Sequence, residues 1–349
     1  LFLTESCNLA CSYCFVKDKK PKKMSLENIF EAINFLVFYS GNKNLLNITL
    51  FGGEPLMEKE NIYKILEKCE NIETQSGNKK FSISITTNGT LLDEEVLRRT
   101  QGKINYLLSI DGDEETHDSS RKYANGKGSF KTILPKIQLL KKYQPWLGAR
   151  MTITPDTVSR LAKNIEYLHS LGINQFLLGL AVDIDWDENS LELYEKQLFE
   201  VGGFYISKRK SGESIRITNF EKDENGINCH EHRWGCGAGR NTISVNTDGE
   251  IYPCSKFLGY EGFNCEEMKL GDIHTGITNI KLRAKMSQIT DESFSGCSGC
   301  SEMNACLGGC PADNYFLNRN IYKPGISHCE LTKINNKVKS ALSKEIDEI

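Results

Sequence analysis

Thirteen cysteines constrain this 349-residue chain most, because they form two dense groups separated by an interior that holds only Cys69. The first group, Cys7-x3-Cys11-x2-Cys14, places three thiols within eight residues. Three thiolates can bind three irons of a [4Fe–4S] cluster and leave the fourth iron open to chemistry. Zinc is the alternative, but a closed zinc site takes four ligands and the nearest histidine, His117, is more than a hundred residues away.

The second group of cysteines occupies the C-terminal third. It reads Cys236-x12-Gly249-x4-Cys254, Cys297-x2-Cys300-x5-Cys306-x3-Cys310 and then Cys329. With Cys229 these are eight thiols, which suit two four-cysteine sites, and the residues alone leave iron–sulfur clusters and zinc ribbons both open. Of the remaining cysteines, Cys69 lies in a helical pattern as a small buried hydrophobe, and Cys265 lies in a polar loop with no assigned partner.

Strand-like runs alternate with helical patterns from residue 1 to about residue 210, which implies parallel β/α units. Helices are expected after Ser25 as N-cap, over Val158–Leu168 and over Leu191–Arg209. Six such units fall short of the roughly 250 residues of a complete eight-unit barrel, so we predict an α/β fold with a partial (β/α)6 TIM-like barrel. The expected strands are Leu1–Thr4, Asn47–Phe51, Phe81–Thr86, Tyr106–Ile110, Arg150–Ile153 and Gln175–Leu180.

Composition shifts after this region to Gly-, Asn- and Cys-rich segments. We expect a barrel over 1–212, a linker over 213–228, a Cys-rich domain over 229–330 and a C-terminal helix over 331–349. The run Asn246–Gly249 predicts a hairpin turn that brings Cys236 near Cys254. The chain begins with Leu1 and not Met, so we expect the natural protein to begin earlier.

The first cysteine motif, with Tyr13 before its last Cys, and the later Gly52-Gly53-Glu54-Pro55 resemble the signature of radical S-adenosylmethionine (SAM) enzymes. The resemblance implies that SAM binds the open iron and contacts Tyr13, Gly52, Gly53 and Glu54. The stretch from Ser109 to Arg121 resembles one in which the serine contacts the SAM ribose and the arginine its carboxylate, a role that suits a guanidinium. A solvated loop residue is the alternative for Arg121. Thr87-Asn88-Gly89 alone is a turn signal.

The later cysteines resemble the SPASM extension of radical SAM enzymes that mature peptides and proteins. That resemblance implies two auxiliary clusters, and therefore three [4Fe–4S] clusters in all. The inner cluster takes Cys236, Cys254 and Cys310 with Cys229 as fourth ligand, a place that His230 or His232 could take instead. The outer cluster takes Cys297, Cys300, Cys306 and Cys329.

The resemblance implies a radical SAM oxidoreductase that crosslinks a ribosomally made, Cys-rich precursor peptide, with a thioether favoured and a carbon–carbon bond possible. Anaerobic sulfatase maturases, which oxidise Cys or Ser to formylglycine, are the alternative, but they carry Asp where this chain has Ser255 after Cys254. A non-catalytic Fe–S or zinc-binding protein is the alternative of another class. Flavodoxin or ferredoxin is the expected electron donor.

Charge and hydropathy exclude two classes of partner. There are 43 Lys plus Arg against 46 Asp plus Glu, a net charge of −3, so bulk charge does not favour nucleic acid. No apolar run approaches the roughly 20 residues that a membrane crossing requires. We therefore expect a cytoplasmic protein with neither nucleic acid nor membrane as partner. A loop rich in lysines, residues 17–23, is expected to face solvent, although a basic rim could attract an acidic peptide.

Overall fold

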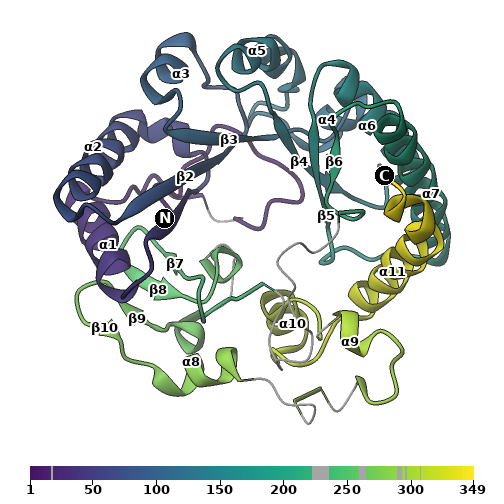
Figure 1. The fold of residues 1–349 in the computed structure, drawn as a ribbon. Helices are drawn as coiled ribbons and strands as arrows, with labels where there is room; N and C mark the ends of the chain where they lie inside the picture. The colour runs from purple at the N-terminus through teal and green to yellow at the C-terminus, as the bar shows by residue number, and fades with distance from the viewer. Residues whose placement is uncertain (17–18, 222–235, 259–264, 289–292, 295–296, 307) are drawn as a thin grey trace. The chain divides into compact units, whose positions relative to one another are not determined.

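The computed structural model describes residues 1–349 except 17–18, 222–235, 259–264, 289–292, 295–296 and 307 (Figure 1). Cys229, His230, His232 and the end of the expected linker lie outside the described residues. The chain forms two compact units. The first contains Leu1–Ser109, Asp118–Leu147 and Ala238–Ala284, and the second contains Ile110–His117, Gly148–Gly237 and Lys285–Ile349. The domain boundaries expected from the sequence stay a prediction.

Six strands form a parallel α/β sheet in the order of the chain, which confirms the predicted fold class. Within each unit the pairings of these six strands are parallel. Parallel neighbours need a long crossover connection between them, and helices provide it here. Along β1 every second residue is buried, so one face of this strand packs into the core. The strands are β1 (Leu45–Leu50), β2 (Lys80–Thr87) and β3 (Ile104–Ser109) in the first unit, and β4 (Gly148–Ile153), β5 (Gln175–Leu180) and β6 (Arg216–Ile217) in the second.

Helices follow the strands of the first unit, and α1 and α2 lie side by side (Figure 1). The helix predicted after Ser25 is confirmed as α1. Ser25 is its N-cap, because the Ser25 side chain accepts a hydrogen bond from the Asn28 amide at 3.1 Å. Cys69 is buried in α2, as predicted. The helices are α1 (Leu26–Tyr39), α2 (Lys59–Ser76), α3 (Glu94–Thr100) and α5 (Phe130–Tyr143), with α4 (Glu114–Ser120) across the boundary between the units and a 3-10 turn, η1 (Pro55–Glu58), before α2.

A small antiparallel sheet completes the first unit, with strands β7 (Ser244–Val245), β8 (Glu250–Tyr252), β9 (Gly271–Asp272) and β10 (Gly276–Ile277). The predicted hairpin turn is confirmed between β7 and β8. Asn246 Oδ1 accepts from the amides of Asp248 and Glu250, and Gly249 has φ of +92°, a conformation that favours glycine. Short helical turns follow as η3 (Ser255–Leu258) and η4 (Cys265–Met268), and α8 (Ile280–Ser287) begins in this unit.

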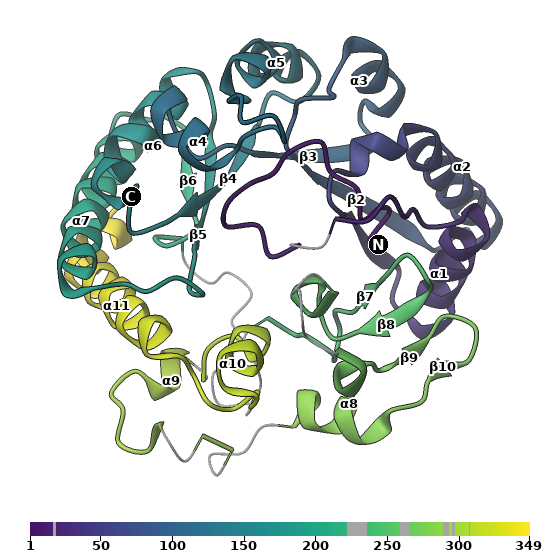
Figure 2. The ribbon, with the colours of Figure 1, turned by 180° about the vertical axis from the view of Figure 1, so that it is seen from behind.

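In the second unit the long helix α7 (Glu188–Lys210) and the C-terminal helix α11 (Ile326–Asp347) lie side by side (Figure 2). The fully buried Tyr194 of α7 donates its hydroxyl to Asn335 of α11 at 2.9 Å. A buried hydroxyl that finds its acceptor fixes how the two helices pack. The other helices are α6 (Leu161–Ser170), preceded by η2 (Val158–Arg160), and the short α9 (Met303–Cys306) and α10 (Pro311–Asn318).

Two expectations about the strands are wrong in detail. Leu1–Thr4 forms two isolated β-bridges and not a regular strand. Phe2 pairs in parallel with Phe51, and Thr4 pairs antiparallel with Lys23. The sixth strand is β6, inside the segment expected as linker, where Arg216–Ile217 pair with β5. Across the described parts of the chain, every helix is too short or too polar to cross a membrane.

Candidate functional site

The loop that carries the first three cysteines, residues 7–14 and here called the Cys loop, leaves the sheet directly beside the two glycines. The Gly53 amide donates to the Thr4 carbonyl at 2.8 Å, and the Glu54 amide donates to the Ser6 carbonyl at 2.9 Å. These two bonds continue the pairing that began at Phe2 and Phe51. The glycine motif therefore lies against the residue before the first predicted iron ligand.

Glycine is required at both positions because the two backbones approach so closely. A Cβ on Gly52 would lie 2.4 Å from the Thr4 carbonyl oxygen, and one on Gly53 would lie 2.2 Å from the Ser6 carbonyl oxygen and 2.9 Å from Cys7 Cβ. Real side-chain carbons do not make such contacts. The two glycines thus form a backbone cradle for the start of the Cys loop.

The Glu54 carboxylate lies behind this cradle and is only 1% exposed. Its Oε1 accepts from the Leu56 amide at 3.0 Å and the Thr87 hydroxyl at 2.7 Å, and its Oε2 accepts from the Asn88 amide at 2.7 Å. Burial raises the pKa of Glu54 to about 7, although the three hydrogen bonds favour the charged form and oppose this shift. Glu54 therefore links the glycine motif to the end of β2.

Thr87 and Asn88 are the residues whose part in the site the sequence analysis missed, since it interpreted them only as a turn. The Asn88 side chain donates to Asn8 Oδ1 at 2.9 Å and lies 3.9 Å from Cys7 Sγ. Asn8 in turn donates to the Thr90 hydroxyl at 2.7 Å. The available signal was their position after a buried parallel strand, where polar side chains gather at the carboxyl edge of the sheet.

Arg121 lies against the Cys loop and not in solvent. The loop pairs with the backbone on both sides of it, since the Ala10 amide donates to Lys122 and the Ser12 amide to Ser120. The guanidinium carbon lies 5.3 Å from the centroid of the Tyr13 ring, a cation–π geometry. Arg121 is 6% exposed, so the interpretation as a solvated loop residue is wrong. Ser109, the last residue of β3, is buried at 9% exposure.

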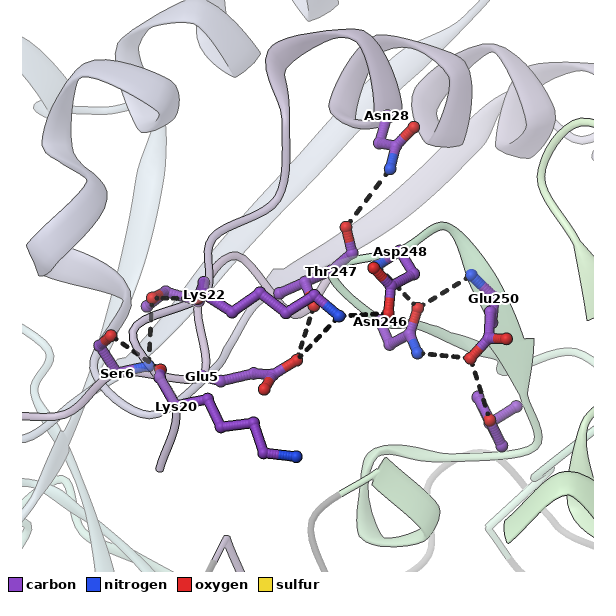
Figure 3. A network of polar contacts seen from close by, with 11 residues as sticks. Glu5, Ser6, Lys20, Lys22, Asn28, Asn246, Thr247, Asp248 and Glu250 are labelled. Atoms are coloured by element: carbon purple, nitrogen blue, oxygen red, sulfur yellow. Dashed lines mark hydrogen bonds and ion pairs between the residues drawn. The ribbon is translucent and has the colours of Figure 1, made fainter. Parts of the chain in front are cut away.

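A polar network binds the β7–β8 turn to the segment that precedes the Cys loop (Figure 3). Thr247 Oγ1 donates to Glu5 Oε1 at 2.7 Å, and Asn28 donates to the Thr247 carbonyl at 3.3 Å. Lys22 forms ion pairs with both Glu5 and Asp248. One of the lysines expected to face solvent therefore helps to hold the β7–β8 turn to Glu5, two residues before the Cys loop, within the first unit.

In the second unit, Asp111 and His117 form a buried turn. The Asp111 amide donates to His117 Nδ1 at 3.4 Å, Asp111 Oδ1 accepts from the Thr152 amide at 2.8 Å, and His117 has no exposed surface. These contacts give both residues a structural role. The guanidinium of Arg150 in β4 lies where a side chain on Gly179 of β5 would be.

The four cysteines predicted for the outer cluster all belong to the second unit. Burial raises the pKa values of the Cys297 and Cys329 thiols, and the other outer cysteines raise them further. Three of the four belong to the segment 297–306, and the fourth lies in the first turn of α11. Their grouping into one cluster stays a prediction.

The remaining predicted ligands are less closely defined. Cys254 belongs to the first unit, whereas Cys236 and Cys310 belong to the second, so their grouping stays a prediction. The Gly239 amide donates to the Pro253 carbonyl at 3.1 Å, which brings the chain after Cys236 beside the chain before Cys254. Within the described residues, no three His, Cys or carboxylate side chains form a ready metal site.

The residues nevertheless fit the groups that the resemblance implies. The glycine cradle lets the backbone before Cys7 approach more closely than a Cβ would allow, and the thiols are the donors that iron–sulfur clusters take. Residues 1–168 match the family model of the radical SAM superfamily, and residues 236–301 match SPASM, an iron–sulfur cluster-binding domain. The chain therefore carries a radical SAM domain followed by a SPASM domain, as its sequence predicted.

Relatives of this chain include both uncharacterised proteins and maturation enzymes. An uncharacterised protein of Archaeoglobus fulgidus is 28% identical over 95% of this chain and 77% of its own length. A cysteine-type anaerobic sulfatase-maturating enzyme of Clostridium perfringens is 24% identical over 88% of this chain and 86% of its own length. The sporulation killing factor maturation protein SkfB of Bacillus subtilis is 25% identical, over 84% and 66%.

Solved structures share this fold. Native anSMEcpe with bound AdoMet and Kp18Cys peptide has a TM-score of 0.76 at 22% identity, over 99% of this chain and 98% of that chain. Streptococcus suis SuiB bound to the precursor peptide SuiA has a TM-score of 0.65 at 16% identity, over 94% and 74%. At these identities the likeness shows the fold.

Proposed function

We propose that the chain is a radical SAM peptide maturase, which takes a hydrogen from a ribosomally made peptide and forms a crosslink, with a thioether favoured over a carbon–carbon bond. The single observation that carries this proposal is the cradle of Gly52 and Gly53 against the Cys loop. It combines a backbone without side chains, three thiols and the buried Arg121 within one unit.

The first cluster would be held by Cys7, Cys11 and Cys14, and SAM by Tyr13, Ser109, Arg121 and the motif Gly52-Gly53-Glu54. When bound, the cluster and SAM supply the radical chemistry that side-chain acids and bases cannot. Arg121 offers a fork of donors for the SAM carboxylate, and its contact with Tyr13 restricts the directions in which that fork can point. Asn88 steadies the Cys loop through Asn8.

A peptide substrate is supported by the comparisons, because the solved relatives include complexes with the Kp18Cys peptide and with the precursor peptide SuiA. The similarity to sulfatase-maturating enzymes favours formylglycine formation as a second candidate. Ser255 counts against it, because a serine at the start of η3 offers no carboxylate to accept a proton. We therefore prefer a Cys-rich peptide and a sulfur-to-carbon bond.

Two auxiliary clusters complete the proposal, with the inner one on Cys229, Cys236, Cys254 and Cys310. The outer one takes Cys297, Cys300, Cys306 and Cys329, which all belong to the second unit. Held there, iron–sulfur clusters would supply a one-electron acceptor for the oxidation that bond formation requires. We propose a flavodoxin or ferredoxin as electron donor and the cytoplasm as location.

The test combines anaerobic reconstitution with SAM cleavage and mass spectrometry of candidate Cys-containing peptides. A thioether or carbon–carbon crosslink removes two hydrogens from the peptide. Formylglycine formation from cysteine also removes two hydrogens but in addition exchanges sulfur for oxygen, so the two products differ in mass. The matched control is the triple variant Cys7→Ala/Cys11→Ala/Cys14→Ala, in which SAM cleavage must disappear. A zinc-loaded protein without SAM cleavage would contradict the proposal and favour a non-catalytic binding protein.

A further inference from the structure

Two short segments, one before and one after the Cys loop, are bonded to each other. These are residues 4–6 and residues 20–22, here called the neck. The Glu5 amide donates to the Lys22 carbonyl at 2.8 Å, and the Thr4 hydroxyl donates to the same carbonyl at 3.0 Å. The neck therefore fixes one edge of the segment from which the Cys loop starts.

The glycine cradle fixes the opposite edge of that segment. The amides of Gly53 and Glu54 donate to the carbonyls of Thr4 and Ser6. Backbone groups of successive residues in an extended chain point to opposite edges, so Thr4 and Ser6 bond to the cradle while Glu5 bonds across the neck. Because the backbone is used on both edges, any further support for this segment must come from side chains.

The Glu5 carboxylate supplies that support by binding the β7–β8 turn (Figure 3). Thr247 Oγ1 donates to Glu5 Oε1 at 2.7 Å, and Thr247 is only 3% exposed. A hydrogen bond to a charged group stabilises more than one between neutral groups. The turn is fixed beside Glu5 by two further bonds, since Asn28 of α1 donates to the Thr247 carbonyl at 3.3 Å and the Phe2 amide donates to the Val245 carbonyl at 2.9 Å.

Lys22 adds less to the same junction. It forms an ion pair with Asp248, and its Nζ lies 3.9 Å from Glu5 Oε1. The side chains of Lys22 and Asp248 are 41% and 52% exposed. Exposed ion pairs contribute little to stability, because water and salt screen them. Thr247 is therefore the residue of the turn whose contact should matter most for the neck.

The turn that carries Thr247 is held by its own side chains. Asn246 Oδ1 accepts from the amides of Asp248 and Glu250 at 3.0 and 2.9 Å, and Asn246 Nδ2 donates to Glu250 Oε2 at 2.8 Å. Thr247 lies in the region that matches the SPASM model, and Glu5 lies in the region that matches the radical SAM model. Both belong to the first unit, so this bond joins the two family regions within one compact body.

We propose that Thr247 is a positioning residue for SAM cleavage, because its bond to Glu5 holds residues 4–6 against the glycine cradle and so fixes where the Cys loop starts. Thr247 acts through Glu5 and the neck. The SPASM region thus supplies a part of the site that the radical SAM region does not contain. The inference rests on the proposed function, since it requires that the Cys loop take part in SAM cleavage.

The first test measures amide hydrogen exchange in the full chain after anaerobic reconstitution. Thr247→Val removes the hydroxyl, so exchange of the Glu5 amide should accelerate by roughly tenfold. Thr247→Ser keeps a hydroxyl and should exchange like the wild type. Thr275→Val changes an exposed threonine in the turn between β9 and β10 and is the matched control. The Ile83 amide in β2 reports opening of the whole sheet and should exchange at the wild-type rate in every variant.

Two results of this test would overturn the positioning role. The first is wild-type exchange of the Glu5 amide in Thr247→Val, or an equal acceleration at Ile83, because the effect would then be absent or global. The second is a larger acceleration in Asp248→Asn than in Thr247→Val, because the exposed ion pair would then matter more than the buried bond.

The second test measures SAM cleavage by the same variants at equal iron content. Cleavage should fall by roughly tenfold in Thr247→Val, because small displacements beside reacting groups slow a reaction steeply. It should recover in Thr247→Ser, which restores the donor to Glu5, and stay at the wild-type rate in Thr275→Val. Wild-type cleavage in Thr247→Val would overturn the inference.

Failure of the proposed function has a separate signature. If the wild type cleaves no SAM, the proposed function fails whatever the exchange rates are. If the wild type cleaves SAM and Thr247→Val matches it in both exchange and cleavage, the proposed function stands and only the inference fails.

Discussion

The substitution Gly53→Ala tests the cradle, because it adds one carbon against the backbone of Ser6, the residue before the Cys loop. The new Cβ would lie 2.2 Å from the Ser6 carbonyl oxygen. Ordinary contact requires about 3.5 Å, so the two backbone segments must separate by more than about 1 Å. That shift strains the bond from the Gly53 amide to Thr4 and moves Cys7. Forcing a carbon into a well-packed site costs about 1–3 kcal/mol.

Two measurements follow this substitution. Urea unfolding of the metal-free protein should show a loss of about 1–3 kcal/mol, and SAM cleavage by the reconstituted protein should fall roughly a hundredfold, because a displacement of about 1 Å near reacting groups has effects of that size. Gly203→Ala is the control. It lies in α7 with no atom within 4 Å of the added carbon, and alanine there should stabilise the helix by about 0.5–1 kcal/mol. Wild-type stability and wild-type SAM cleavage in Gly53→Ala would refute the cradle.

Three further substitutions test other contacts. Asn88→Ala removes the bond to Asn8 and should cost about 1 kcal/mol in urea unfolding, with faster iron loss from the first cluster to a chelator; unchanged iron retention would contradict its role. Burial raises the pKa of Glu54 from 4.5 to about 7, so the folded protein binds the proton more tightly than the unfolded chain does. The resulting stabilisation, about 3 kcal/mol, is fully present below pH 4.5 and is lost as the pH rises through 7. In Glu54→Gln that pH dependence should be absent from urea midpoints between pH 5 and 8, and a slope equal to that of the wild type would show the assignment to be wrong. Tyr194→Phe removes the buried hydroxyl that donates to Asn335 Oδ1, which still accepts from Asn219, and should lower stability by about 1 kcal/mol, whereas a neutral result would mean that this bond does not dock α11.

The sequence predicted the elements whose signals are local and periodic. Ser25 and the apolar spacing after it were sufficient to place α1, and Asp248-Gly249 was sufficient to place the β7–β8 turn. A strand of two residues such as β6 has no period to detect, so it was missed. Leu1–Thr4 has the composition of a strand, but its pairing is limited to single bridges because the Cys loop leaves the sheet there.

The same contrast holds for the candidate site. Cysteine spacing predicts the outer group, because proximity in the chain accounts for three of its four members, and this grouping stays a prediction. Contacts between distant segments could not be predicted. The bond from Thr87 to Glu54 joins residues far apart in the chain, and the contact of Arg121 with Tyr13 depends on how the Cys loop pairs with the segment around residue 121. Such partners become visible only in the folded chain.

The central claim is that this chain carries iron–sulfur clusters that cleave SAM. The most direct measurement is iron, sulfide and zinc per chain after anaerobic reconstitution, together with 5′-deoxyadenosine formed by the dithionite-reduced protein. The account predicts about twelve irons for the wild type and about eight for Cys7→Ala/Cys11→Ala/Cys14→Ala, with 5′-deoxyadenosine from the wild type only. Bound zinc in place of iron, and no 5′-deoxyadenosine from the wild type, would contradict it.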